Sequence, residues 1–434
     1  MNRFTTSWGD LQLTRFPEDP REQLRAWDAA DEYLLRHLHG DPDLPAAPAA
    51  AGTAGTAGTA GTAGAAEPAE AADAPAPPRA AVELRGTVVV LGDRWGALTT
   101  ALATALAAAS PASASPAATL VQLGDSYLAR EATRANLVRN GLDPEAVQLL
   151  AGTDTPPERI DVLLIRVPKS LALLEDQLHR LAPALHPGTV VIGTGMVTEI
   201  HTSTLQLFER LVGPTRTSLA VRKARLILST PAPAPARTAA SPWPLRYALP
   251  DGIGAVSGRT VVNHAGIFCA DRLDIGTRFL LEHLPARQGR EQVVDLGCGN
   301  GVVGTAAALA NPAAEVTFID ESFAAVASAE ATFRTNTPPG AVAHFQAGDG
   351  LADVPTGSVD LVLTNPPFHT HQATTDATAS RMFADARRAL RQGGELWVVG
   401  NRHLAYHVRL RRLFGNCRTV AGNPKFVVLR AVKR

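Results

Sequence analysis

Short apolar runs alternate with amphipathic segments along the C-terminal half of the chain. The runs consist mainly of Val, Leu, Ile and Phe, which is typical of strands buried on both faces. Strands are predicted at 291–297, 315–320, 358–364, 395–401 and 425–432. Helices are predicted between them at 300–312, 321–336 and 380–394. This alternation predicts a doubly wound α/β domain with a mostly parallel sheet.

The N-terminal half repeats this pattern. VVVLGDRWGALTTALA at 88–103 matches VVDLGCGNGVVGTAAA at 293–308, and RIDVLLIRVPKSL at 159–171 matches SVDLVLTNPPFHT at 358–370. These matches predict an internal duplication, and therefore a second domain of the same α/β class.

The two copies differ at positions where chemistry would occur. Asp295 of the second copy corresponds to Val90 of the first, and Asn365 corresponds to Arg166. The first copy keeps the strand pattern but loses these polar atoms. We therefore expect it to be non-catalytic, with a structural or RNA-gripping role.

Segments without a periodic pattern set the domain boundaries. A helix is predicted at 21–39, and it is followed at 41–78 by an Ala/Gly/Thr/Pro insert without an apolar face, which predicts a disordered tether. A Pro/Ala-rich stretch at 231–244 predicts a linker. We expect an N-terminal domain at 1–230 and a catalytic domain at 245–434.

The bulk composition excludes several classes of protein. The 434 residues are 45% hydrophobic and carry no formal net charge, which fits two cores and does not itself indicate a nucleic-acid partner. The three cysteines are too scattered for a disulfide framework or a zinc site. No signal peptide is evident, and the Ala-rich run 101–120 is interrupted by prolines. We expect a cytoplasmic protein without a metal or a membrane segment, and a monomer, although the sequence leaves the oligomeric state open.

VVDLGCGNG, at 293–301, is a strand that leads into a glycine-rich turn. Such a turn lets the backbone approach a ligand without obstruction from Cβ atoms, and Asp295 can accept hydrogen bonds from the ligand. Asp320 ends the next predicted strand, where a carboxylate can bind ribose hydroxyls. Gly299, Gly301 and Gly304 also satisfy the dinucleotide pattern G-x-G-x-x-G, which is weak by itself.

TNPPFH, at 364–369, follows a buried strand and argues against a dehydrogenase. Asn365 offers a side-chain carbonyl and Pro366 a backbone carbonyl at a fixed φ, so that together they can accept both hydrogens of an amino group on a planar ring. Phe368 can stack on that ring and fix its plane. A strand terminator alone would need only the two prolines.

Other polar residues carry weaker signals. Asp349 follows a short predicted strand and can meet an adenine amino group, or it is an acidic loop residue. Cys298 is expected to pack as a small apolar group, and Asp274 either walls a cofactor cleft or begins a capped helix. His369 and His371 lack partners at metal-ligand spacing, so we expect them to be solvated or RNA-facing.

The tail from 401 to 434 contains nine basic residues and no Asp or Glu. Such a tail suits contacts with phosphate groups, although a solvated helix face is the alternative.

The motifs DLGCGNG, FIDES and TNPPFH, together with the basic tail, resemble those of the ribosomal RNA guanine-N2 methyltransferases. LQLTRFP, AWDAADEYLL and KSLALLE in the N-terminal half are most similar to the members that act on large-subunit RNA. The resemblance covers nearly the whole chain apart from the insert and the linker. It implies two tandem Rossmann-like class I methyltransferase domains, the first degenerate, and S-adenosyl-L-methionine as cofactor.

Carried onto this sequence, the resemblance and the motifs assign site residues. The expected catalytic residues are Asn365, Pro366, Pro367 and Phe368. The expected cofactor-binding residues are Asp295, Gly297, Cys298, Gly299, Asn300, Gly301, Asp320, Asp349 and Asn365.

We therefore expect methylation of the N2 amine of one guanine in 23S rRNA, either as free RNA or in a large-subunit assembly intermediate. The base would have to be unpaired or flipped to reach residues 365–368, which we call the clamp. A 16S rRNA enzyme, a glutamine methyltransferase acting on a release factor, and a non-catalytic RNA-binding factor of ribosome assembly remain open alternatives.

Overall fold

The computed structural model describes residues 2–20, 22–45, 80–109, 118–233, 241–367 and 372–434, without the side chains of 372–377. Most of the predicted insert, half of the predicted linker, and Phe368, His369 and His371 lie outside this set. No helix in the described ranges is long and apolar enough to cross a membrane. These ranges also contain no group of three or more His, Cys, Asp or Glu residues that could hold a metal ion.

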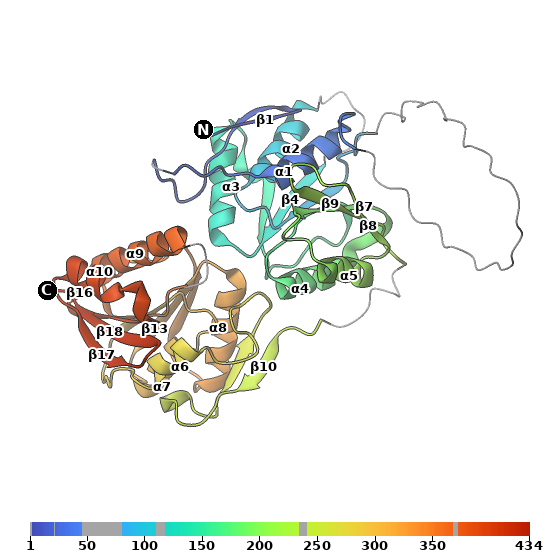
Figure 1. Ribbon diagram of the computed structural model, residues 1–434. Coiled ribbons are helices and arrows are strands. Elements are labelled where there is room, and N and C mark those ends of the chain that lie inside the picture. Colours follow the sequence, from blue (N-terminus) through green and yellow to red (C-terminus); the bar gives the residue numbers. More distant parts are fainter. Residues whose placement is uncertain (1, 21, 46–79, 110–117, 234–240, 368–371) are drawn as a thin grey trace, which may run out of the picture.

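The N-terminal half contains a hairpin, a helix and a seven-stranded α/β unit (Figure 1). Its elements are β1 (Arg3–Thr6), β2 (Gly9–Gln12), α1 (Ala29–His39), β3 (Thr87–Leu91), α2 (Ala97–Ala108), β4 (Thr119–Gly124), α3 (Tyr127–Arg139), η1 (Pro144–Ala146), β5 (Val147–Ala151), β6 (Ile160–Arg166), α4 (Leu171–Leu181), η2 (Ala182–Ala184), β7 (Leu185–Met196), α5 (Thr202–Leu211), β8 (Thr215–Thr217) and β9 (Ala224–Ser229).

The C-terminal half repeats the α/β unit after a short hairpin. Its elements are β10 (Leu245–Ala248), η4 (Gly254–Val256), β11 (Thr260–Asn263), α6 (Ile275–Leu281), β12 (Gln292–Leu296), α7 (Val302–Ala310), β13 (Glu315–Asp320), α8 (Phe323–Asn336), β14 (Ala343–Ala347), β15 (Val359–Thr364), α9 (Gln372–Ala389), β16 (Leu390–Asn401), η5 (Arg402–Leu404), α10 (Tyr406–Phe414), β17 (Arg418–Gly422) and β18 (Phe426–Val432).

The two sheets have the same topology. Their strand orders are β5-β4-β3-β6-β7-β9-β8 and β14-β13-β12-β15-β16-β18-β17. The first five strands of each order pair in parallel and the last two pair antiparallel, so that only β9 and β18 run against the others. Leu91 pairs with Ile165 in the first sheet, and Leu296 pairs with Thr364 in the second. Arg166 and Asn365 therefore occupy equivalent places, as the duplication predicts.

Each sheet is covered by helices on both faces. In β3, Val88 and Val90 join the core that contains α1 and α2, whereas Val89 and Leu91 join the core that contains α4 and α5. The second sheet is covered in the same way by α6, α7 and α8 on one face and by α9 and α10 on the other. Burial on both faces explains why these strands are continuously apolar rather than alternating.

Two helix predictions were wrong at their ends. The helix predicted at 21–39 begins only at Ala29, because Asp28 is its N-cap and forms a capping box, and Leu24 is 56% exposed. The helix predicted at 380–394 ends at Ala389. Leu390 instead begins β16, and Gly393 adopts φ +77°, which a helix cannot contain.

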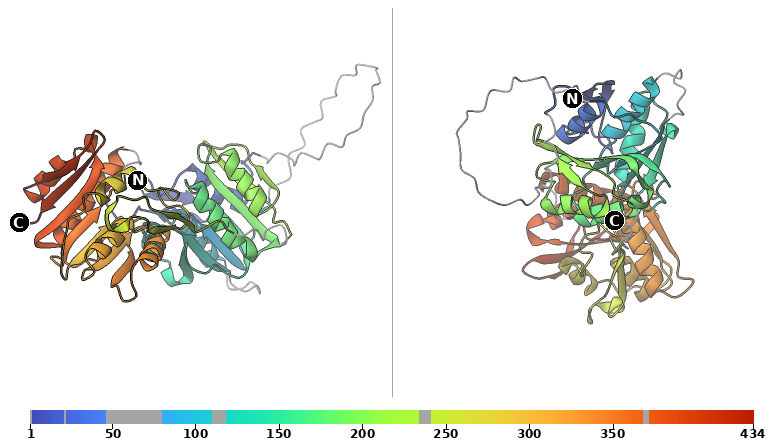
Figure 2. Two further views of the ribbon diagram at one scale, coloured as in Figure 1. Left: turned by 90° about the horizontal axis from the view of Figure 1, so that it is seen from below. Right: turned by 90° about the vertical axis from the view of Figure 1, so that its right-hand side faces the viewer.

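Figure 2 shows the two lobes that contain the sheets side by side. The same segment of each copy, residues 125–127 and 321–323, joins them. We call this the paired-turn contact. Ser322 Oγ donates to Asp125 Oδ2 at 2.6 Å, and Ser126 Oγ donates to Glu321 Oε2 at 2.6 Å. The Ala324 N–H adds a 2.7 Å bond to Asp125 Oδ1. Each carboxylate thus holds the serine that caps the helix of the other copy.

Backbone and ring contacts complete the paired-turn contact. The Tyr127 N–H donates to the Glu321 carbonyl oxygen at 2.8 Å, and the Phe323 N–H donates to that of Asp125 at 2.9 Å. The Arg130 guanidinium lies 5.3 Å from the centre of the Tyr127 ring and 4.7 Å from that of Phe323. The contact is approximately two-fold symmetric because it joins equivalent segments of a duplicated chain.

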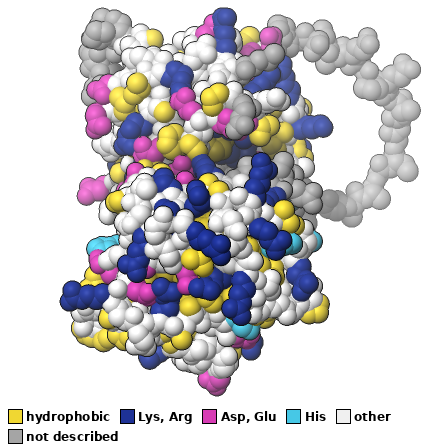
Figure 3. Space-filling view, turned by 90° about the vertical axis from the view of Figure 1, so that its left-hand side faces the viewer, with side chains coloured by type: hydrophobic (Ala, Val, Ile, Leu, Met, Phe, Trp, Pro, Cys, Tyr) yellow, Lys and Arg dark blue, Asp and Glu magenta, His cyan; other side chains and the backbone are white. Residues whose placement is uncertain are grey.

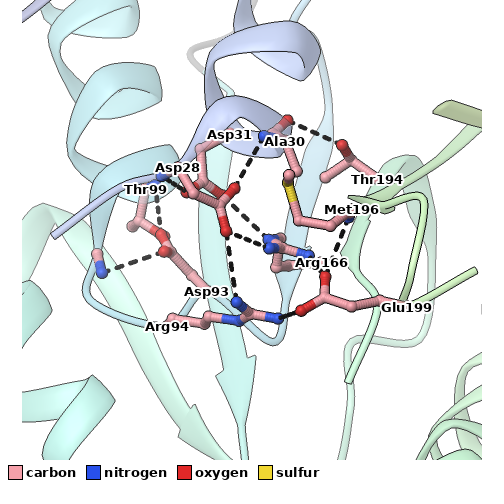
Figure 4. Close-up of polar contacts among 11 residues, drawn as sticks. Asp28, Ala30, Asp31, Asp93, Arg94, Thr99, Arg166, Thr194, Met196 and Glu199 are labelled. Carbon is pink, nitrogen blue, oxygen red and sulfur yellow. Dashed lines mark hydrogen bonds and ion pairs between the residues drawn. The ribbon is translucent and has the colours of Figure 1, made fainter. Parts of the chain in front are cut away.

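In the first copy, the place equivalent to Asn365 is filled by an ion-pair network around the buried Arg166 (Figure 4). Its guanidinium lies 2.6 Å from Asp28 Oδ2, 3.3 Å from Asp31 Oδ1 and 2.8 Å from Glu199 Oε2. Arg94 joins Glu199 at 2.6 Å and Asp28 at 3.4 Å. The Arg166 side chain is fully buried and is not accessible at the surface of this structure.

Burial and charge act in opposite directions on the carboxylates of this network. Burial raises the pKa of Asp31 to about 7, and the nearby Arg166 only partly offsets this. For Glu199, burial is outweighed by Arg166 and Arg94, which hold its pKa at about 2. Arg166 is therefore the cation on which the buried carboxylates depend.

Arg166→Met should lower the free energy of unfolding by about 3 kcal/mol or more, because it leaves buried carboxylates without their partner. Chemical denaturation of the full chain measures this. Arg216, which is exposed on β8, provides the control, since Arg216→Met should change stability by less than about 0.5 kcal/mol. Equal effects of the two substitutions would contradict the assigned role.

The paired-turn contact should depend on pH. Burial raises the pKa of Asp125 to about 7, against hydrogen bonds from Ser322 and Ala324 that lower it. In the unfolded chain the pKa is about 4. The contribution of this group to stability is therefore fully present below pH of about 4 and is lost as the pH rises through about 7.

Asp125→Asn keeps an acceptor for the Ala324 N–H and a donor for Ser322, but it does not titrate. We expect the Tm of this variant minus that of the wild type to increase by roughly 3 °C or more from about pH 5 to pH 8. Scanning calorimetry at the two pH values measures the difference. A Tm difference that does not change with pH would contradict the prediction.

Candidate active site

The loop after β12 is held against the end of β13 by three successive backbone amides. The N–H groups of Gly297 and Cys298 donate to the Ile319 carbonyl oxygen at 2.8 and 3.1 Å, and that of Gly299 donates to Asp320 Oδ2 at 2.9 Å. Gly299 has φ +53°, and among the described residues nothing beyond its chain neighbours lies within 4 Å of the position that a Cβ would take. The backbone is therefore open to a ligand at this point.

Gly301 is required for a different reason. It has φ +73°, and a Cβ there would lie 2.6 Å from Ala329 Cα on α8. This glycine allows α7 to pack closely on α8, so ligand approach does not explain every glycine of the motif.

Two buried carboxylates lie beneath the loop. Asp295 is 2% exposed, and its Oδ2 accepts from the Gly304 N–H at 2.7 Å. Burial raises the pKa of Asp295 to about 8, and the Asp320 charge adds to this effect. Burial also raises the pKa of Asp320, whose Oδ1 accepts from the Ser322 N–H at 3.0 Å. Backbone donors compensate this desolvation only in part, so further donors from a ligand would be favourable there.

The remaining predicted cofactor residues make contacts within the protein. Asn300 Nδ2 donates to Asn263 Oδ1 at 3.0 Å and orients the glycine loop. Cys298 is buried, and burial raises the pKa of its thiol well above its usual range, so it packs as a neutral group. Asp349 forms a 2.9 Å ion pair with Arg381 of α9. Burial raises the pKa of Asp349 despite this arginine.

Asn365 follows β15 and is held by the first turn of α6. Its Nδ2 donates to Asp274 Oδ2 at 3.1 Å and to Thr277 Oγ1 at 2.9 Å. Its Oδ1 is buried and has no hydrogen-bond partner among the described residues. Pro366 is buried and Pro367 is exposed, while Phe368 lies outside the described residues. Within the part of the chain that the structure describes, this oxygen is thus left without a donor at the end of β15.

Thr277 was missed by the sequence analysis, and the contact of Asp274 with Asn365 was missed as well. Asp274 was expected only as a cleft wall or a helix cap, and the structure shows that it is the N-cap of α6, with Oδ2 accepting from the Thr277 N–H at 2.8 Å. A signal was present in the sequence, because LDIGTRFLL at 273–281 matches WDAADEYLL at 27–35.

The C-terminal half presents a basic face, shown in the lower part of Figure 3. α10 buries Tyr406 and Phe414 and exposes Arg411 and Arg412. Arg418 is exposed on β17. The same helix therefore has an apolar face that packs in the core and a charged face turned to solvent. Both interpretations of the basic tail, a solvated helix face and a phosphate-binding surface, fit this arrangement.

Comparison with known proteins matches both halves of the chain. A family model described as the methyltransferase small domain matches residues 258–430, and one described as the RLMG N-terminal domain matches residues 1–50 and 71–233. A solved 16S rRNA N2 methyltransferase from T. thermophilus, in complex with AdoMet and guanosine, is similar with a TM-score of 0.63 and 24% identity over 81% of this chain and 90% of that one. This likeness confirms the α/β fold with two mostly parallel sheets.

Similar sequences cover the whole chain. "Ribosomal RNA large subunit methyltransferase G" of Streptomyces griseus is 64% identical over 434 residues, which is 100% of both chains. Proteins of the same name are 63% identical in Streptomyces coelicolor, over 99% of this chain and 100% of that one, and 43% identical in Pseudomonas aeruginosa, over 100% of both. The chain is therefore a methyltransferase and belongs to the ribosomal RNA large subunit methyltransferase G family.

Proposed function

We propose that this methyltransferase transfers a methyl group from S-adenosylmethionine to the exocyclic N2 amine of a guanine in 23S rRNA. The observation that carries the proposal is Asn365 Oδ1, a buried acceptor without a donor in the described part of the chain. An unpaired buried polar atom calls for an explanation, and this one lies at the carboxyl end of a parallel strand, where ligands bind in doubly wound folds. A nucleobase amine would supply the missing donor.

The clamp would act on this amine with two acceptors. Asn365 Oδ1 would accept a hydrogen bond from one N–H of the amine, and the Pro366 backbone carbonyl oxygen would accept one from the other N–H. The amine lone pair is otherwise delocalised into the ring, and holding both hydrogens out of the ring plane returns it to the nitrogen. When bound, S-adenosylmethionine supplies an electrophilic methyl group. Most of the rate would come from alignment and preorganised dipoles, with Phe368 stacked on the base and the Pro367 ring beside it.

The residues around the glycine loop fit this cofactor. The open backbone at Gly299 admits a ligand, and the incompletely satisfied Asp320 lies beside it to accept from ribose hydroxyls. Asp349 would meet the adenine amino group. The other residues proposed to form the cofactor site are Asp295, Gly297, Cys298, Asn300 and Gly301.

The two halves of the chain would have different roles. Residues 245–434 carry the clamp and the glycine loop, and we assign catalysis to them. In residues 1–230 the equivalent place is closed by Arg166 and its carboxylates, which supports a non-catalytic role.

The full-length relatives support 23S rRNA as the target, and the exposed Arg411, Arg412 and Arg418 offer contacts to its phosphates. The test incubates the purified protein with labelled S-adenosylmethionine and unmodified 23S or 16S rRNA, free or in subunit precursors, and maps the label. Label at a guanine N2 in 23S rRNA is expected. Label in 16S rRNA alone would overturn the proposed target, and absence of both label and calorimetric cofactor binding would overturn catalysis.

Asn365→Ala should lower kcat by about 100-fold or more, because the amine loses the hydrogen-bond acceptor that holds it in the orientation required for methyl transfer. Cofactor affinity, measured by calorimetry, should stay within about 3-fold. Asn311→Ala is the matched control, because it removes a buried amide of the same domain at the end of α7. Activity retained in Asn365→Ala would contradict the role of the clamp.

Replacing Arg411 and Arg412 together by Gln should weaken binding to rRNA and make the slope of log affinity against log salt shallower by roughly 1 to 2. Filter binding at several salt concentrations measures both. Arg334→Gln is the control, because Arg334 is already paired with Glu330 on α8, 3.4 Å away. An unchanged slope in the double variant would show that this face does not contact phosphate.

A further inference from the structure

We propose that Asp274 and Thr277 are positioning residues that fix which way the Asn365 amide faces. This inference rests on the proposed function, in which Asn365 Oδ1 accepts a hydrogen from the target amine. If the amide turned over, its nitrogen would face the amine and two donors would oppose each other. The clamp therefore requires one of the two amide orientations.

The hydrogen bonds of α6 select that orientation. An Asn side-chain nitrogen carries two hydrogens, and both are taken here, one by Asp274 Oδ2 at 3.1 Å and one by Thr277 Oγ1 at 2.9 Å. A carboxylate only accepts, so the turned-over amide would place its oxygen against another acceptor. The buried Oδ1 is consequently the atom left for a ligand.

Asp274 is itself held rigidly. Its Oδ2 caps α6 by accepting from the Thr277 N–H at 2.8 Å, and Thr277 Oγ1 lies 3.3 Å from the same atom. On the other side, Gly276 brings the helix close to the ring of Phe426 on β18, where a Cβ would lie 3.2 Å from the ring. The two acceptors are thus fixed by a helix start that is packed on the sheet.

The first copy shows the same construction with a different occupant. Asp28 is the N-cap of α1 and Asp31 is its third residue, and both hold Arg166 at the equivalent strand end. In the second copy the N-cap aspartate is kept, the third residue is Thr277, and the strand end is Asn365. The contact from helix start to strand end therefore belongs to the duplicated fold, and the second copy uses it to orient an amide instead of enclosing a cation.

The experiment measures the steady-state kcat of methyl transfer to unmodified 23S rRNA by the full-length protein. Asp274→Ser keeps an N-cap oxygen for the Thr277 N–H but is too short to reach Asn365. We expect kcat to fall about 10- to 100-fold, with cofactor Kd within about 3-fold of the wild type and little change in Tm. Asp274→Asn keeps a carbonyl oxygen for both donors and should restore kcat to within about 5-fold of the wild type.

Three further variants separate positioning from general stability. Thr277→Val should lower kcat as Asp274→Ser does, and Thr277→Ser should restore it. In the first copy, Asp28→Asn should lower Tm, because it weakens the pairing of Arg166, and leave kcat unchanged.

The outcomes separate this inference from the proposed function. A wild-type protein that methylates no rRNA overturns the function. An active wild type whose Asp274→Ser variant keeps its kcat, or loses only cofactor affinity, overturns the positioning role and leaves the function standing.

Discussion

In each copy of this fold, a carboxylate at the start of a helix is bonded to a side chain at the end of the fourth strand of the sheet. That strand is β6 in the first copy and β15 in the second. In the first copy the bonded pair is Asp28 with Arg166, and in the second it is Asp274 with Asn365. The bond joins α1 or α6 to the carboxyl end of a parallel sheet, where ligands bind in doubly wound folds. The occupant of this place differs between the copies, a guanidinium in the first and an amide in the second.

The charge of the occupant accounts for the divergence of the copies. A guanidinium requires several carboxylates around it once it is buried, and Asp28, Asp31 and Glu199 provide them. A neutral amide requires only two acceptors for its nitrogen, which leaves its oxygen available. A change of side chain on a shared backbone thus distinguishes a strand end that is surrounded by ion pairs from one that leaves an amide oxygen unpaired among the described residues.

The first copy is directly hydrogen-bonded to the second. Glu321 and Ser322, which bond the first copy in the paired-turn contact, follow Asp320 in the chain, and Asp320 accepts from the glycine loop. Movement between the lobes would therefore act next to the proposed cofactor site. This arrangement gives the first lobe a physical connection to the proposed cofactor site.

The amino-acid sequence alone determined the alternation of strands and helices, the duplication, the glycine loop and the clamp motif, because buried strands and tight turns leave local patterns of residue type. It also placed Asn365 and Arg166 at equivalent positions. Only the tertiary structure decided that α1 begins at Asp28, that Gly301 serves helix packing, and that Asp274 and Thr277 hold Asn365. These contacts join side chains far apart in the chain, and hydrogen-bond direction depends on folded geometry that no local pattern records.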